Sequence, residues 1–477
     1  MSGMKTSRLA KVGVAALATA LMVSGCGSRA SDTEIAEALR GPASTAVTDS
    51  TGAVAPGTVG DAAVPAQGGT APAAADGAKQ AQPSTSTAKS GTGSSGDASA
   101  PGSKPGGSAG TQTAAAPTVA DKSPVKIGQL GTFSGVLGAV SSSAPKVLSA
   151  WISYTNAHGG LNGHPLQLVV ADDQGDPSTS LTLAKRLVES DKALMMVGNF
   201  MPFGFPQVEQ YVRSKGVPML GDGVDPGWFT SPVAHTVVTP AAAQIVKALQ
   251  TFVDDGASKI GILYCLEIAQ LCGYLNDQVR KSEVGKYVVE SYQVSLVAPS
   301  YTSQCLRMKQ AGIEVLYLLL ESAGAARAAK DCAAQGFTPQ LVLLSLAATA
   351  DLPKLAALNG AVLPSGTVSP AATGVPGLEK YRRILGTYAA SLGDSGIGVY
   401  AFASAEMLGV IGKNLPNNPT SADFLEGMSK VKNETLGGLT VPLTYPKGKG
   451  VSVKPCAFIW GLENGRYTAP KGSKPIC

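Results

Sequence analysis

Three carboxylates lie close together at Asp172, Asp173 and Asp176, in the stretch LQLVVADDQGDP. Acidic side chains at such spacing can bind a metal ion, form an acid/base pair for catalysis, or cap a turn. A calcium loop needs acids at alternate positions before a glycine and a later glutamate, which this stretch lacks. The apolar run before it and Pro177 after it instead predict a strand, a turn and a helix whose N-cap is Asp176. We therefore expect a structural turn, with a metal or catalytic role as the alternative.

The chain around this turn alternates short apolar runs with helical patterns. The expected strands are 125–131, 166–173, 194–198 and 217–220, and then, after a restart near Pro240, 259–265, 288–294, 314–320 and 341–345. The expected helices include 145–158, 177–190, 205–215, 241–255, 302–312 and 323–335. Strands that alternate with such helices predict parallel, doubly wound sheets, and the restart predicts two sheets in tandem. The end of the chain is strand-like and rich in turns.

The N-terminus is typical of an export signal. Residues 1–25 carry three cations and no acid, followed by an apolar run too short to span a bilayer comfortably. Their end, together with Cys26, resembles the lipobox of bacterial lipoproteins, in which that cysteine is lipidated. We expect a lipoprotein signal peptide at 1–25 and a lipid anchor at Cys26. The alternative is an ordinary signal peptide in which Cys26 is incidental.

Residues 26–121 are dominated by Ala, Gly, Ser, Thr and Pro, and the first aromatic residue of the chain is Phe133. Such a composition has too little apolar bulk to offset the entropy lost on ordering. We expect a disordered tether that holds a folded domain away from a membrane surface, or a spacer that only aids solubility.

The charge and the histidine content exclude several classes of protein. The net charge of +5 falls to +2 without the signal, and no cationic cluster with interleaved aromatics supports nucleic-acid binding. The three histidines, His158, His164 and His235, are not paired at ligand spacing, so we expect no metal site and no cofactor. The tetrapeptide GDSG at 393–396 resembles a protease nucleophile turn, but it follows a helical pattern and has no catalytic partners. We expect no enzyme.

The stretches VKIGQLGTFSGVLGAV, AWISYTNAHGGLNGHPLQLVVADDQGDPSTSLTLAKRLVESDKALMMVGN, SKGVPML, KIGILYC and CAAQGFTPQ resemble one family. It is the type I periplasmic binding proteins, specifically the leucine/isoleucine/valine-binding receptors of ABC importers. The resemblance covers residues 124–477 and is most specific over the first 75 of these. It implies two α/β lobes joined by a three-segment hinge, which close over a small solute. The expected lobes are 122–240 plus 371–440 and 241–370 plus 441–477, with crossings near Pro240, Pro370 and Val441.

The resemblance also implies where the solute binds. In the family, the loops after the third and fourth strands of the first lobe hold the ligand's carboxylate and ammonium with serine and threonine hydroxyls and backbone groups. The corresponding loops here, NFMPFGFP and GDGVDPGWF, contain neither serine nor threonine, and Asp225 stands where one hydroxyl belongs. The expected ligand-binding residues are Thr132, Phe133, Phe200, Met201, Pro202, Phe203, Gly223, Val224, Asp225, Trp228, Glu267, Glu321 and Ser345.

These loops are rich in aromatic residues, and pockets lined by aromatics with few polar anchors suit apolar solutes. A tryptophan beside an aspartate also suits a cationic head group. We therefore expect a small apolar or amphipathic solute and not a free branched-chain amino acid. The alternative is that the rings pack beneath the loops and that backbone amides alone hold an amino acid.

Apart from Cys26 there are six cysteines, an even number in a chain expected outside the cytoplasm. Cys265 ends a strand and Cys272 follows one loop later, so we expect that pair to bridge. Cys456 and Cys477 are expected to fasten the C-terminus. Cys305 and Cys332 are expected at offset positions on helices that flank one strand, so a bridge and two buried free thiols both remain as alternatives.

Three functions are weighed. The first is a lipid-anchored, monomeric receptor that passes its solute to an ABC permease, and its closed form gains contacts from the second lobe. The second is a sensory protein of the same fold that signals to a regulator. The third is an enzyme on this scaffold, for which no nucleophile–base set is present. We expect the first.

Overall fold

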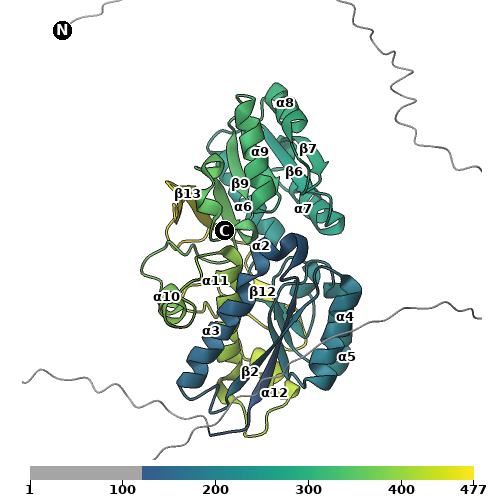
Figure 1. Cartoon of the computed structure of the whole chain (residues 1–477), viewed down its shortest axis with the longest axis vertical. Coiled ribbons are helices and arrows are strands. Elements are labelled where there is room, and N and C mark those ends of the chain that lie inside the picture. The colour runs from purple at the N-terminus through teal and green to yellow at the C-terminus, as the bar shows by residue number, and fades with distance from the viewer. Residues whose placement is uncertain (1–120) are drawn as a thin grey trace, which may run out of the picture. The chain divides into compact units, whose positions relative to one another are not determined.

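A computed structural model describes residues 121–477 of the chain (Figure 1). The predicted signal peptide, Cys26 and nearly all of the predicted tether lie outside the described residues. Within 121–477, no helix combines the length and the apolar character needed to cross a bilayer.

The first sheet has five parallel strands in the order β2-β1-β3-β4-β5. Its strands are β1 (Val125–Gly131), β2 (Leu166–Asp172), β3 (Met195–Asn199), β4 (Met219–Gly221) and β5 (Ala234–Thr236). Its helices are α2 (Gly138–Ser141), α3 (Ser143–Ala157), α4 (Pro177–Lys185), α5 (Phe205–Lys215), α10 (Pro376–Tyr388), α11 (Gly396–Ile411) and α12 (Ser421–Met428). Figure 1 shows α4 and α5 on one face of this sheet and α3 with α11 on the other. The sheet is therefore doubly wound, as predicted.

The second sheet has seven strands in the order β14-β13-β10-β9-β8-β6-β7. The parallel strands are β6 (Ile260–Cys265), β7 (Val288–Val294), β8 (Val315–Leu319), β9 (Gln340–Leu343) and β10 (Val362–Ser365). The antiparallel strands β13 (Phe458–Glu463) and β14 (Arg466–Thr468) extend it from the C-terminal segment. Its helices are α6 (Ala241–Asp254), α7 (Ala269–Lys281), α8 (Thr302–Ala311) and α9 (Ser322–Ala334).

Three stretches connect the two sheets, after β5, after β10 and after the short strand β11 (Leu443–Thr444), which pairs with β12 (Ser452–Val453). Buried hydrogen bonds fasten them to one another and to the sheets. Thr239 Oγ1 donates to the carbonyl oxygen of Cys456 at 2.8 Å, and Trp460 Nε1 donates to that of Thr367 at 2.9 Å. The fold is thus the predicted α/β fold with two sheets joined by a three-segment hinge, and the second sheet adds the antiparallel strands β13 and β14 to its parallel core. The exact lobe boundaries stay a prediction.

Two local differences from the predicted elements are informative. The helix expected over 177–190 changes to a π-helical turn at Arg186–Ser190. The tetrapeptide GDSG follows α10 and ends on the first residue of α11, and the hydroxyl of Ser395 accepts a hydrogen bond from the Gly398 N–H at the start of α11. That serine is a helix cap.

The aspartates that follow β2 form a structural turn, as predicted. Asp173 is fully buried, and its carboxylate accepts hydrogen bonds from Thr132 Oγ1 at 2.6 Å, Ser180 Oγ at 2.7 Å and the Gly175 N–H at 2.9 Å. Asp176 is the N-cap of α4 and accepts from the Thr179 N–H at 2.6 Å. The carboxylates therefore tie β1, β2 and α4 together.

Three disulfides join Cys265 to Cys272, Cys456 to Cys477 and Cys305 to Cys332. The first two are the expected pairs. The expectation that Cys305 and Cys332 are offset along their helices is wrong, because their Cα atoms lie 4.9 Å apart across the contact between α8 and α9. The structure therefore resolves the open choice in favour of a bridge.

We predict that Asp173→Ala lowers the free energy of unfolding of the full chain by about 2–4 kcal/mol, because it leaves buried hydroxyl and N–H donors without an acceptor. Denaturant unfolding followed by far-UV circular dichroism measures the loss. The control is Asp176→Ala, which removes an exposed cap from the same turn and should cost distinctly less. Equal losses in the two variants would show that the buried network contributes nothing beyond the cap.

Candidate binding site

A cavity that is partly open to solvent lies where the carboxyl ends of both sheets meet. This placement follows from the fold, because the loops after parallel strands gather at one edge of each sheet. Seventeen described residues line it, and sixteen of them are apolar or disulfide-bonded: Leu137, Val140, Phe200, Pro202, Val224, Cys265, Ile268, Leu271, Cys272, Leu275, Leu296, Leu319, Leu320, Leu344, Leu346 and Ala347. The seventeenth is Glu321.

The wall from the second sheet is mostly aliphatic. Ile268, Leu271 and Leu275 recur at intervals of three and four residues, so they share one face at the start of α7. The leucines after β7, β8 and β9 complete the wall. A helix between the strands 259–265 and 288–294 fits the predicted alternation, but none of these three side chains was among the predicted site residues, although their apolar spacing was a usable signal.

Glu321 is the one charged group among these lining residues. It is the N-cap of α9, and its carboxylate accepts hydrogen bonds from the N–H groups of Ala323 and Gly324. The positive end of the helix dipole also favours a carboxylate there. Glu321 therefore places a negative group at an otherwise apolar surface.

A smaller polar pocket of about 320 Å³ of empty space adjoins the apolar one and shares Leu346 with it. It lies at the hinge and is lined by Asp222, Val238, Ala241, Gln244, Ser345, Leu346, Ser365, Gly366, Thr367, Gly396 and Tyr400. The Tyr400 hydroxyl donates to the carbonyl oxygen of Asn199 at 2.9 Å, and Gln244 Nε2 donates to that of Thr239 at 2.7 Å. These bonds fix the polar side chains against the hinge.

Asp222 is the most unusual group in this pocket. Its side chain is buried, and its carboxylate accepts from the N–H groups of Met201 and Val224, each at 2.8 Å. Burial raises the pKa of Asp222 to about 7, and the nearby Asp225 carboxylate acts in the same direction. The two N–H donors belong to the loops after β3 and β4, so an internal carboxylate occupies them.

The structure brings five of the thirteen predicted site residues to these pockets. Phe200, Pro202, Val224 and Glu321 line the apolar cavity, and Ser345 lines the polar pocket.

Trp228 and Asp225 have other roles in the loop after β4. Trp228 is fully buried, its ring packs at a tilt against Phe205 with centroids 4.2 Å apart, and a Cβ atom at Gly221 would overlap it. Asp225 caps the short helical turn Pro226–Phe229, accepting from the Gly227 N–H at 2.7 Å, and burial raises its pKa. Trp228 therefore presents no open face to a cationic head group.

The remaining six predicted residues also lie outside the lining of the two pockets. Thr132 donates to Asp173, and the rings of Phe133 and Phe203 pack against Gly131 and Gly175. Met201 is buried in the core on the α4–α5 face, and Gly223 has a left-handed backbone with φ 68°. Glu267 accepts hydrogen bonds from Ser295 and Leu296. Most of the aromatic side chains predicted to line the site thus pack against the loops themselves, and leucines supply most of the apolar lining.

Sequence similarity places the chain in a family. A model of the periplasmic binding protein family matches residues 124–451. An amino acid binding protein of Pseudomonas aeruginosa is 37% identical over 76 residues, covering 16% of this chain and 20% of that protein. Leu/Ile/Val-binding protein homolog 2 of Brucella abortus is 25% identical over 202 residues, covering 40% of this chain and 53% of that protein. The matches thus span about half or less of these relatives' length.

Solved structures share the fold at low identity. A substrate-binding periplasmic protein from Ralstonia solanacearum is 17% identical with a TM-score of 0.63, covering 72% of this chain and 99% of that one. A fatty acid ABC transporter substrate-binding protein from Thermomonospora curvata is 16% identical with a TM-score of 0.61, covering 72% and 89%. A Rhodopseudomonas palustris solute binding protein in complex with benzoate is 14% identical with a TM-score of 0.62, covering 74% and 97%.

These proteins are solute-binding receptors and not enzymes. The described residues, for their part, hold no group of three His, Cys, Asp or Glu side chains placed to bind a metal. The chain belongs to the periplasmic binding protein family and has the type I fold of the branch that includes the leucine/isoleucine/valine-binding proteins.

Proposed function

We propose that this protein is an extracytoplasmic, lipid-anchored receptor of an ABC importer and that its two lobes close over a small apolar or amphipathic solute. The observation that carries the proposal is the cavity between the carboxyl ends of the two sheets, with sixteen apolar or disulfide-bonded lining residues and one carboxylate. Apolar cavities with few polar anchors suit apolar solutes. The family supports the extracytoplasmic location and a permease partner.

Two features argue against a free amino acid as the solute. In the family, backbone and hydroxyl groups of the loops after β3 and β4 hold the ligand's carboxylate. Here the N–H groups of Met201 and Val224 in those loops donate to Asp222, and the loops offer no serine or threonine. A ligand carboxylate would also meet the like charge of Glu321. The site therefore favours a solute with an apolar body and a neutral or cationic head.

Our first binding prediction uses three ligands that share a ring and differ in head-group charge. In calorimetric titrations of the full chain at pH 7.5, benzamide and benzylamine should bind at least about tenfold more tightly than benzoate, a difference of about 1.4 kcal/mol. Leucine, isoleucine and valine should bind more weakly than benzamide. Tight binding of a branched-chain amino acid would refute the proposed solute class.

Glu321→Gln is the matched variant for this series. The amide oxygen still accepts one of the two hydrogen bonds from the start of α9, while the other bond and the charge are lost. Benzoate should gain affinity and benzylamine should lose it, with benzamide nearly unchanged. A variant that shifts all three ligands alike would mean that Glu321 acts through the shape of the cavity and not through its charge.

Asp222 generates a pH prediction. A carboxyl whose pKa is about 7 in the folded protein and 3.8 ordinarily holds its proton more tightly when folded, so its contribution to stability is lost as pH rises from about 4 to about 7. The difference in unfolding free energy between wild type and Asp222→Asn should therefore change by up to about 1.4 kcal/mol per pH unit in that window, at the expense of wild type.

The comparison with Asp222→Asn is needed because His235 acts in the opposite direction. Burial lowers the pKa of His235 to about 4, so its contribution rises with pH over much of the same range. His235 is present in both proteins and cancels in the difference. A difference that does not vary with pH would show that Asp222 keeps its ordinary acidity in the folded chain.

The anchor rests on Cys26 at the end of the export signal. Cys26→Ser should release the protein from the membrane fraction without changing the affinity of the released chain for benzamide, because lipidation needs the thiol. Fractionation and titration of the released chain measure the two effects. Membrane association that persists in Cys26→Ser would point to another attachment.

A further inference from the structure

The Cys265–Cys272 disulfide forms part of the cavity wall. Cys265 is the last residue of β6, Cys272 lies in the first turn of α7, and both line the apolar cavity while only 3% exposed. The wall residues Ile268 and Leu271 lie between the two cysteines, and Leu275 follows them by one turn. The bridge therefore joins the strand end to the helix that carries these side chains.

The other side chains in this part of the wall are at most partly buried, with Ile268, Leu271 and Tyr274 packed against the core. Within residues 266–274, all of which the structure describes, Cys272 is the only fully buried side chain, and Leu266 is 51% exposed. Ile268, the N-cap of α7, makes no side-chain capping bond, and the first turn contains no acidic residue. A helix start that lacks a side-chain cap and is only partly buried opens more easily than one that is capped and buried.

The nearest other hydrogen bonds to the sheet hold the loop between β6 and α7, and not α7 itself. The Leu266 N–H donates to the carbonyl oxygen of Val294 at 2.9 Å, and the Glu267 carboxylate accepts from the Leu296 N–H at 2.9 Å. Both lie before Ile268. Between them and the buried Leu275, the disulfide is the only covalent link from this part of the described wall to the sheet, and the other contacts with the core are made by partly buried side chains.

We propose that the Cys265–Cys272 disulfide is a positioning element of the solute cavity, which fixes the start of α7 so that Ile268, Leu271 and Leu275 form a defined wall. The expected effect of this disulfide on solute affinity rests on the proposed function, whereas its expected effect on the order of α7 does not depend on that function. Pre-organised walls bind more tightly because no ordering cost is incurred on binding.

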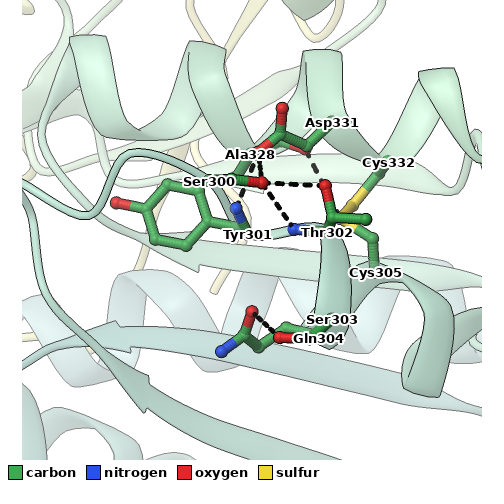
Figure 2. The surroundings of a disulfide bond; sticks show 9 residues. All are labelled: Ser300, Tyr301, Thr302, Ser303, Gln304, Cys305, Ala328, Asp331 and Cys332. Carbon is green, nitrogen blue, oxygen red and sulfur yellow. Dashed lines mark hydrogen bonds between the residues drawn. A yellow bond between two sulfur atoms is a disulfide. The ribbon is translucent and has the colours of Figure 1, made fainter.

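The same lobe supplies a matched control in the Cys305–Cys332 disulfide. That bridge joins α8 to α9 and does not line the cavity. Figure 2 shows the bonds that hold its surroundings independently: the Asp331 carboxylate accepts from the Tyr301 N–H at 2.6 Å and from Ser300 Oγ at 3.0 Å. It also closes a longer stretch, with a sequence separation of 27 against 7.

The experiment compares Cys265→Ala/Cys272→Ala with Cys305→Ala/Cys332→Ala in the full chain. Amide hydrogen exchange in residues 266–275 should speed up by at least about tenfold in the first variant and stay unchanged in the second. A disulfide that closes a longer loop restricts the unfolded chain more strongly. Removing the Cys305–Cys332 bridge should therefore cause the larger fall in Tm. Benzamide affinity should fall several-fold in the first variant only.

Exchange in β8 monitors the rest of the lobe. If the amides of β8 lose their protection from exchange in Cys265→Ala/Cys272→Ala, the lobe as a whole has become unstable. The variant Cys265→Val/Cys272→Val, which restores the side-chain volume, is then used in its place. Unchanged exchange over 266–275, or equal losses of benzamide affinity in both pairs, would overturn the proposal. If wild type does not bind benzamide at all, the proposed solute class fails, and the exchange data still decide whether the disulfide orders the wall.

Discussion

The cavity depends on one constraint of parallel sheets, which is that all parallel strands of a sheet end along the same edge. Phe200 and Val224 follow β3 and β4 at that edge of the first sheet, and Glu321 and Leu344 follow β8 and β9 at that edge of the second. The hinge places the two edges against each other within the described chain. Side chains far apart in sequence therefore meet only because every crossover returns to the same end of its sheet.

Much of this architecture could be predicted from the sequence because apolar periodicity depends on near neighbours alone. Helix α5 and strand β7 have the bounds that the pattern predicts, Phe205–Lys215 and Val288–Val294. The Cys305–Cys332 bridge could not be predicted, since the relative height of α8 and α9 is set by how each packs on the sheet. The π-helical turn at Arg186 has no signal in the local pattern.

The site was less predictable than the fold, because a loop position does not fix where its side chain points. Asp222 and Asp225 lie three residues apart in one loop, yet Asp225 caps its own short helical turn while Asp222 reaches two backbone N–H groups and becomes buried. Only the tertiary structure separates these roles. The roles of the aromatic side chains were equally hard to predict. Trp228 fills the space beneath Gly221, whereas Phe200 lines the cavity.

Together these features suggest how an apolar cavity discriminates between solutes. Aliphatic walls contribute affinity to any apolar body of suitable size, so they distinguish solutes poorly. In the proposed receptor, discrimination would come from two carboxylates, Glu321 in the apolar cavity and Asp222 in the adjoining polar pocket. In low-dielectric surroundings a like charge on the solute is costly, whereas a neutral donor or a cation is not. The side chain of Asp222 also occupies the N–H donors that a solute carboxylate would need, so the same residue removes the favourable contact and adds the repulsive one.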